Sequence, residues 1–222
     1  MDRTFIQNPQ EQLVSVIISD VTLEGNLVIP DGAIGIVLFA HGSGSSRYSP
    51  RNHHVAEVLQ QAGLATLLLD LLTLEEEEID LRTRHLRFDI DLLASRLVGA
   101  TDWLIQNSDT QQLKIGYFGA STGAGAALVA AAKRGEIVKA IVSRGGRPDL
   151  AGSALPQIKA PTLLIVGGDD LPVIAVNEDA LTQLRSIKRL EIVPGATHLF
   201  AEAGKLGIVA NLARQWFTQY LK

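Results

Sequence analysis

The sequence predicts an α/β fold with one mostly parallel sheet of about seven to eight strands and helices on both faces. From residue 34 onward, short apolar runs alternate with longer stretches of helical spacing, which is the order typical of parallel sheets with crossover helices. The apolar runs are unbroken, as expected of strands that helices cover on both sides. A hydrophobic content of 46% agrees with such a buried sheet.

The first strands are expected to form an antiparallel hairpin at the N-terminal edge of the sheet, with strands at 13–19 and 27–30 and a connection over 20–26. Residues 75–78 are four consecutive glutamates, which we interpret as a solvated loop. Further strands are predicted at 34–40, 65–71, 114–120, 139–143, 161–166 and 189–193, and helices at 52–61, 82–106, 124–132, 173–185 and 207–221.

Length and composition restrict the class of protein. The 222 residues contain no internal repeat or low-complexity tract and predict a single domain over 1–222. The sequence has no apolar run near the ~18 residues that span a bilayer and no signal-peptide pattern, so we expect a cytoplasmic protein without a membrane partner. A net charge of −4 argues against nucleic-acid binding. The absence of cysteine excludes disulfides and thiolate metal sites, and we expect no metal and no organic cofactor.

The most informative motif is the pentapeptide at 119–123, Gly-Ala-Ser-Thr-Gly, which has Ser121 at its centre. It lies between a predicted buried strand and a helix of small residues, and this is the context that a nucleophile elbow requires. The flanking glycines suit a turn that leaves no room for a Cβ atom. We therefore predict that Ser121 is a nucleophile.

A serine nucleophile needs a base, and the base needs an acid that orients it. Of the five histidines, His198 is the best placed, because it follows the last predicted strand and strand ends share one edge of a parallel sheet. His41 ends another strand, and we interpret it as a structural residue. Asp169 and Asp170 follow the strand at 161–166, and both are candidates for the acid. The chain order serine, aspartate, histidine is the hydrolase order.

The developing oxyanion needs two hydrogen-bond donors. We expect one from the backbone N–H of Thr122 in the elbow and the other from Ser43, in the glycine-containing loop after the strand at 34–40. This loop lacks the lysine of a phosphate-binding P-loop and the spacing of a dinucleotide fingerprint.

A family resemblance extends over most of the chain and is carried by residues 41–47 (HGSGSSR), 119–123 (GASTG) and 143–148 (SRGGRP) together with His198. The chain resembles an α/β-hydrolase related to dienelactone hydrolase. In such proteins the acid is followed three residues later by valine, so the resemblance assigns the acid to Asp170, which precedes Val173 in this way. Dienelactone hydrolases use cysteine at the elbow, whereas this chain has Ser121, and the resemblance therefore implies a serine esterase or related acyl hydrolase.

Four arginines, Arg47, Arg51, Arg144 and Arg147, flank the predicted site loops. Arg47, Arg144 and Arg147 are candidates for binding an anionic part of the substrate, and the alternative is that these side chains pair with acids and hold loops. We expect a hydrolase that cleaves a small ester or lactone, with a small-molecule substrate as its partner. Acyl transfer or perhydrolysis on the same triad, and ligand binding without turnover, remain alternatives.

Overall fold

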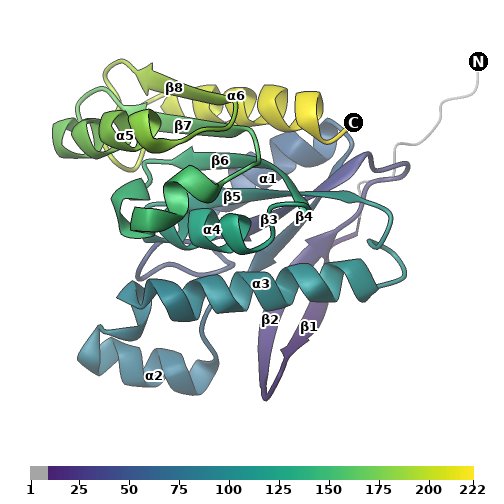
Figure 1. Cartoon of the computed structure of the whole chain (residues 1–222). Coiled ribbons are helices and arrows are strands. Elements are labelled where there is room, and N and C mark those ends of the chain that lie inside the picture. Colours follow the sequence, from purple (N-terminus) through teal and green to yellow (C-terminus); the bar gives the residue numbers. More distant parts are fainter. Residues whose placement is uncertain (1–9) are drawn as a thin grey trace, which may run out of the picture.

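The computed structural model describes residues 10–222, which build an eight-stranded sheet with helices on both faces (Figure 1). The strand order is β1-β2-β4-β3-β5-β6-β7-β8. Only the pairs β1–β2 and β2–β4 are antiparallel. The predicted mostly parallel sheet with an antiparallel pair at its N-terminal edge is confirmed. The strands are β1 (Gln12–Ile18), β2 (Val21–Val28), β3 (Gly35–Ala40), β4 (Leu64–Leu69), β5 (Lys114–Ala120), β6 (Val138–Arg144), β7 (Thr162–Gly167) and β8 (Lys188–Val193).

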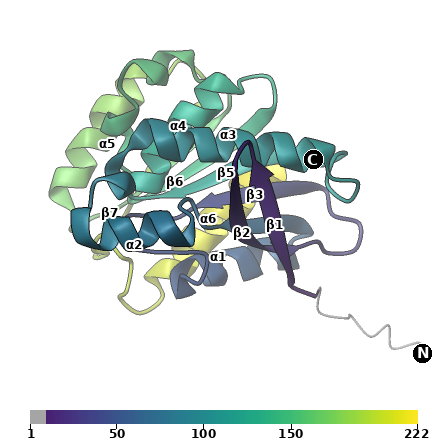
Figure 2. The same ribbon diagram turned by 90° about the horizontal axis from the view of Figure 1, so that it is seen from below.

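The helices form two layers. Helices α1 and α6 pack together on one face, and α3 and α4 lie side by side on the other (Figures 1 and 2). Within residues 10–222, no helix is long and apolar enough to cross a lipid bilayer. The helical segments are α1 (Pro50–Gln61), α2 (Leu74–Thr83), the 3₁₀ turn η1 (Leu86–Phe88), α3 (Ile90–Gln106), α4 (Thr122–Lys133), the 3₁₀ segment η2 (Pro148–Gln157), α5 (Leu171–Gln183) and α6 (Lys205–Tyr220).

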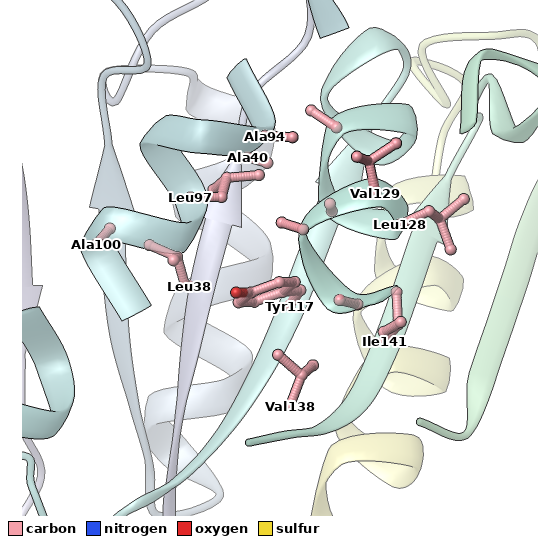
Figure 3. Packing of buried hydrophobic residues seen from close by; sticks show 14 of the residues in the cluster. Leu38, Ala40, Ala94, Leu97, Ala100, Tyr117, Leu128, Val129, Val138 and Ile141 are labelled. Atoms are coloured by element: carbon pink, nitrogen blue, oxygen red, sulfur yellow. The ribbon is translucent and has the colours of Figure 1, made fainter. Parts of the chain in front are cut away.

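The core under α3 and α4 fixes β5, the strand that leads to Ser121. Tyr117 lies fully buried between the two helices and the sheet (Figure 3). Its hydroxyl group is paired with that of Thr101 on α3. Helix α4 is mostly alanine and glycine, so it packs closely on the strands. The packing of α3 and α4 therefore holds the end of β5 in place.

The hairpin differs from the predicted one. Its turn is at Ser19, which has a positive φ of 54°, and β2 begins at residue 21 rather than 27. The polar residues that we interpreted as a connection are part of the strand because neighbouring residues accommodate them. Gly25 leaves room for Leu67 of β4, and Asn26 binds Glu11 and Arg47 through its side-chain amide.

The expected helix over 82–106 and the expected loop at 75–78 are also wrong. The four glutamates lie in α2, where Thr73 and Glu76 form a capping box and acidic side chains suit the positive end of the helix. The helix ends at Arg84, which adopts the left-handed conformation with φ of 58°. Asp89 then caps α3 by accepting a hydrogen bond from the N–H of Leu92. Two helices therefore replace one.

Candidate active site

Ser121 lies at the tight turn between β5 and α4, with φ of 50° and ψ of −121°. Such a backbone is strained for a residue with a side chain, and the surrounding packing must hold it in place. A Cβ atom on Gly119 would lie 2.4 Å from Cα of Ala124, and one on Gly123 would lie 2.3 Å from the carbonyl oxygen of His41. Both positions therefore require glycine, as the motif predicts.

The turn aims Ser121 at a histidine from the far end of the chain. Its Oγ lies 3.3 Å from Nε2 of His198, in the loop after β8, and Nδ1 of the same ring lies 2.7 Å from Oδ2 of Asp170. A carboxylate only accepts hydrogen bonds, so Nδ1 carries the proton and Nε2 is left to accept one from the serine hydroxyl. The arrangement has the order of contacts found in a nucleophile, base and acid.

Of the two adjacent aspartates, the structure brings Asp170 to the imidazole. The carboxylate of Asp170 is largely buried, with 14% of its side chain exposed. Asp169 is exposed, and its backbone N–H donates to the carbonyl of Ala196. Within residues 10–222 its carboxylate forms no ion pair with a histidine.

The loop after β3 lies directly against the elbow. A Cβ atom on Gly42 would be 3.2 Å from Cβ of Ser121. The backbone N–H groups of Ser43 and Thr122 have no hydrogen-bond acceptor within residues 10–222. Two free donors next to a serine hydroxyl are what an oxyanion site requires.

His41 supports this loop. Its Nε2 accepts a hydrogen bond from the N–H of Leu71, so its Nδ1 carries the proton and donates to the carbonyl of Gly42. Burial lowers the pKa of His41, in spite of the opposing effects of the Gly42 carbonyl and of Asp70. The ring is thus neutral and already bonded on both nitrogens, which fits the structural role that we predicted.

A cavity of about 220 Å³ opens beside the loop at 41–46, under α2 and η1. Sequence reasoning missed this cavity because it did not predict α2. The capping pattern Thr73-x-x-Glu76 was the available signal. Leucines from the segment after β4, from α2 and from α3 make much of its wall apolar, while three carboxylates and Arg87 lie around it. These residues are Leu71, Leu72, Leu81, Leu93, Asp70, Glu77, Asp80 and Arg87.

Two of the arginines that we considered for substrate binding already have acidic partners. The buried guanidinium of Arg47 contacts Asp70 and Glu24 and donates to Asn26. That of Arg147 forms two hydrogen bonds with Asp149. Both guanidinium groups therefore make the contacts with acidic residues that the alternative interpretation predicts.

Arg144 is different. It ends β6, and its carbonyl oxygen accepts a hydrogen bond from the N–H of Ser121 at 3.2 Å. Only 7% of its surface is exposed, yet its Nε and Nη1 have no hydrogen-bond partner in the described part of the chain. Burial and then the positive charge of Arg51 lower the pKa of Arg144 to about 10.

Comparison with known proteins gives one matching family. The model of the dienelactone hydrolase family matches residues 23–221. A crystal structure of a dienelactone hydrolase from Anabaena variabilis is 76% identical, with a TM-score of 0.96 over 97% of this chain and all of that one. Est1E from Butyrivibrio proteoclasticus shares the fold at 16% identity, with a TM-score of 0.77 over 93% of this chain and 98% of Est1E.

Two curated relatives carry a different name. Proteins from two strains of Mycobacterium tuberculosis, provisionally named as phosphoribosyl transferases, are 56% identical over 212 residues. This match covers 96% of the chain but 47% of each relative. The chain therefore spans about half the length of these curated relatives.

Proposed function

The chain belongs to the dienelactone hydrolase family, and we propose that it is a serine hydrolase that cleaves small carboxylic esters or lactones through an acyl-enzyme. The observation that carries this proposal is the continuous set of contacts from Ser121 to His198 to Asp170, at 3.3 Å and 2.7 Å. Family membership supports a hydrolase. The contacts support serine, rather than the cysteine that the chain lacks, as the attacking group.

In the proposed mechanism, Oγ of Ser121 attacks the ester carbonyl carbon while Nε2 of His198 takes the hydroxyl proton. The carbonyl oxygen becomes an oxyanion, which the N–H groups of Thr122 and Ser43 stabilise. Asp170 stabilises the imidazolium that forms. The C–O bond to the leaving alcohol then breaks, and His198 delivers its proton to that alcohol oxygen.

Water completes the cycle. His198 takes a proton from a water molecule, whose oxygen attacks the acyl carbon. The bond between that carbon and Oγ of Ser121 then breaks, the carboxylic acid leaves, and His198 returns the proton to Oγ. The side chain of His198 is 38% exposed, so water has direct access to this base. That access favours hydrolysis over acyl transfer or perhydrolysis, which need water to be excluded or outcompeted.

The cavity beside the loop at 41–46 is our candidate for the non-reacting part of the substrate. Its volume of about 220 Å³ suits a small group, and its leucines suit an apolar one. The name phosphoribosyl transferase refers to whole proteins of which this chain matches about half, and we do not transfer that activity to it. We also propose that the chain forms a single domain and acts in the cytoplasm. A chain without cysteine forms no disulfides and therefore has no need of an oxidising compartment.

Labelling with a fluorophosphonate, followed by peptide mapping, tests the nucleophile. We expect one label, on Ser121. The Ser121→Ala variant should remain folded, take up no label and lose roughly 10⁴ or more in kcat on a small ester, because triad members act as a unit. The matched control is Ser153→Ala, which removes an exposed serine from η2 and should label normally. A label on Ser43, Ser45 or Thr122 would overturn the assignment.

A further inference from the structure

We propose that Asn177 on α5 is a positioning residue for the triad. Its side-chain amide fixes the loop at 145–147, and this loop in turn fixes the imidazole of His198. Asn177 forms no hydrogen bond with a triad residue, so it acts through the loop. The effect on catalysis rests on the proposed hydrolase function, whereas the positioning of the imidazole does not.

The loop at 145–147 lies against both the base and the nucleophile. A Cβ atom on Gly145 would lie 3.5 Å from both Cε1 and Nδ1 of His198, so the imidazole ring faces this residue at close range. The backbone N–H of Arg147 donates to the carbonyl oxygen of Ser121 at 3.1 Å. A displacement of this loop would therefore change the position of the base relative to the nucleophile.

The side chain of Asn177 ties this loop to α5. Gly146 is buried, and a buried carbonyl oxygen needs a hydrogen-bond donor. Nδ2 of Asn177 donates to that oxygen at 3.0 Å, and it also donates to the carbonyl of Val173 at 2.7 Å. Among the described residues, the bond to Gly146 is the only side-chain hydrogen bond between α5 and the loop.

Helix α5 also carries the acid of the triad. Asp170 is the N-cap residue of α5, and its carbonyl oxygen accepts a hydrogen bond from the N–H of Val173 at 3.0 Å. Its carboxylate lies 2.7 Å from Nδ1 of His198. The imidazole thus has one support at the start of α5 and another at Gly145. Asn177 joins these two supports.

The alternative is that Asn177 only fills the core. Its side chain is fully buried, yet Oδ1 has no hydrogen-bond partner in the described part of the chain. Burying such an oxygen costs free energy, and an apolar side chain of similar size would avoid that cost. Core packing alone therefore does not account for asparagine here, whereas an amide donor to Gly146 does.

The variant Asn177→Ser separates the two hydrogen bonds of the amide. In a helix, a serine hydroxyl can donate to the carbonyl four residues earlier, which is that of Val173, but its side chain is too short to extend to Gly146. We expect kcat for a small ester to fall at least about tenfold, because small misplacements of a catalytic group are costly. KM should stay within about twofold, since the cavity at 41–46 is untouched.

The matched control is Leu184→Ala, which removes a buried side chain at the opposite end of α5. It should lower the thermal midpoint at least as much as Asn177→Ser but keep kcat within about threefold, when both are assayed at a temperature at which they are folded. A loss of kcat below tenfold in Asn177→Ser, or an equal loss in Leu184→Ala, would overturn the proposal. Should Asn177→Ser fail to fold, Asn177→Leu removes the same donor at similar size and is judged in the same way.

A spectroscopic measurement tests the positioning without turnover. Long-range proton–nitrogen correlation spectra show which ring nitrogen of His198 carries the proton, and His198→Gln identifies its signals. At about pH 8 we expect the Nδ1–H tautomer in the unaltered protein and in Leu184→Ala, because Asp170 accepts that proton. In Asn177→Ser the Nε2–H tautomer should become populated, since the ring loses its fixed support at Gly145.

The spectra and the kinetics fail in different ways. An unchanged tautomer in Asn177→Ser would refute the positioning role of Asn177. If the unaltered enzyme cleaves no ester, the proposed function fails, while the spectra still decide whether Asn177 positions the imidazole.

Discussion

Asp170 determines which nitrogen of His198 carries the proton. Its oxygen lies 2.7 Å from Nδ1, and this contact leaves Nε2 free to face Ser121. Asp169 precedes it on the same loop but is exposed. One residue of sequence therefore separates an aspartate that contacts the imidazole of His198 from one that is exposed.

Replacing each aspartate by asparagine tests this difference. Asp170→Asn keeps the shape of the side chain but can donate to Nδ1, which would hold the imidazole in the wrong tautomer, so we expect kcat to fall by up to ~10⁴. Asp169→Asn should cost less than about threefold in kcat, since its side chain is solvated. The measurement is kcat and thermal midpoint for both variants side by side. An inactive Asp169→Asn enzyme beside an active Asp170→Asn enzyme would move the assignment by one residue.

The meeting of Ser121, Asp170 and His198 could be predicted because each follows the carboxyl end of a strand, and parallel strands bring these ends to one edge. The contacts that the arginines make could not be predicted in the same way. Arg47 pairs with Glu24 and Asp70, each 23 residues away along the chain. Such pairing depends on where loops fold back, and no local pattern encodes it.

At the scale of secondary structure elements, α2 and η1 cover the cavity beside the oxyanion loop. They are joined by Asp80, whose buried carboxylate accepts hydrogen bonds from the backbone N–H and the Nε of Arg87. Burial opposes ionisation of Asp80, but these bonds and the charge of Arg87 outweigh it and lower the pKa of Asp80. The pair therefore fixes the wall of the cavity.

Asp80→Asn should loosen this cover. It leaves the Arg87 charge without its partner, and we expect a loss of roughly 2 kcal/mol in the free energy of unfolding together with a raised KM for small esters. Asp91→Asn is the matched control, because the Asp91 side chain is 92% exposed and its one ion pair is long. Denaturant unfolding and steady-state kinetics check both variants. Equal stability of the two variants would contradict the role given to Asp80.

The same pair has a defined pH dependence. Since the folded pKa of Asp80 is below its ordinary value of 3.8, its contribution is full above that value and is lost as the pH falls below it. The difference in stability between the unaltered protein and Asp80→Asn should therefore shrink below about pH 3.8.

The elements that periodicity predicts best are those buried on a sheet. The expected strand at 114–120 has the bounds of β5, and the expected helix at 207–221 differs from α6 by one or two residues at each end. The errors fall at 20–26 and over 75–89, where polar residues are common. Polar composition predicts loops at 20–26 and 75–78, but a two-residue turn and a capping box determine the structure instead. Both features depend on a few specific contacts.

At the scale of the whole molecule, one sheet separates two apolar layers. The layer under α3 and α4 contacts Trp103, and the layer under α1 and α6 contains Trp216. Both layers pack against the same strands, with alternate residues of each strand facing opposite sides. The packing of one layer thus supports the other, and this is the basis of our proposal of a single domain.

The two tryptophans, the only ones in the chain, make this proposal measurable. Trp103→Phe and Trp216→Phe each leave one fluorescent reporter, on opposite faces of the sheet. Leu97→Ala, which empties part of the layer under α3, should cost about 2–5 kcal/mol and shift the curve reported by Trp216 as much as that reported by Trp103, because a single domain unfolds as a unit. Leu13→Ala, at an exposed site of β1, is the control and should shift neither curve by much. The measurement is guanidinium unfolding followed by fluorescence and by circular dichroism. If Leu97→Ala moves only the Trp103 curve, the two layers unfold independently and the single-domain proposal is wrong.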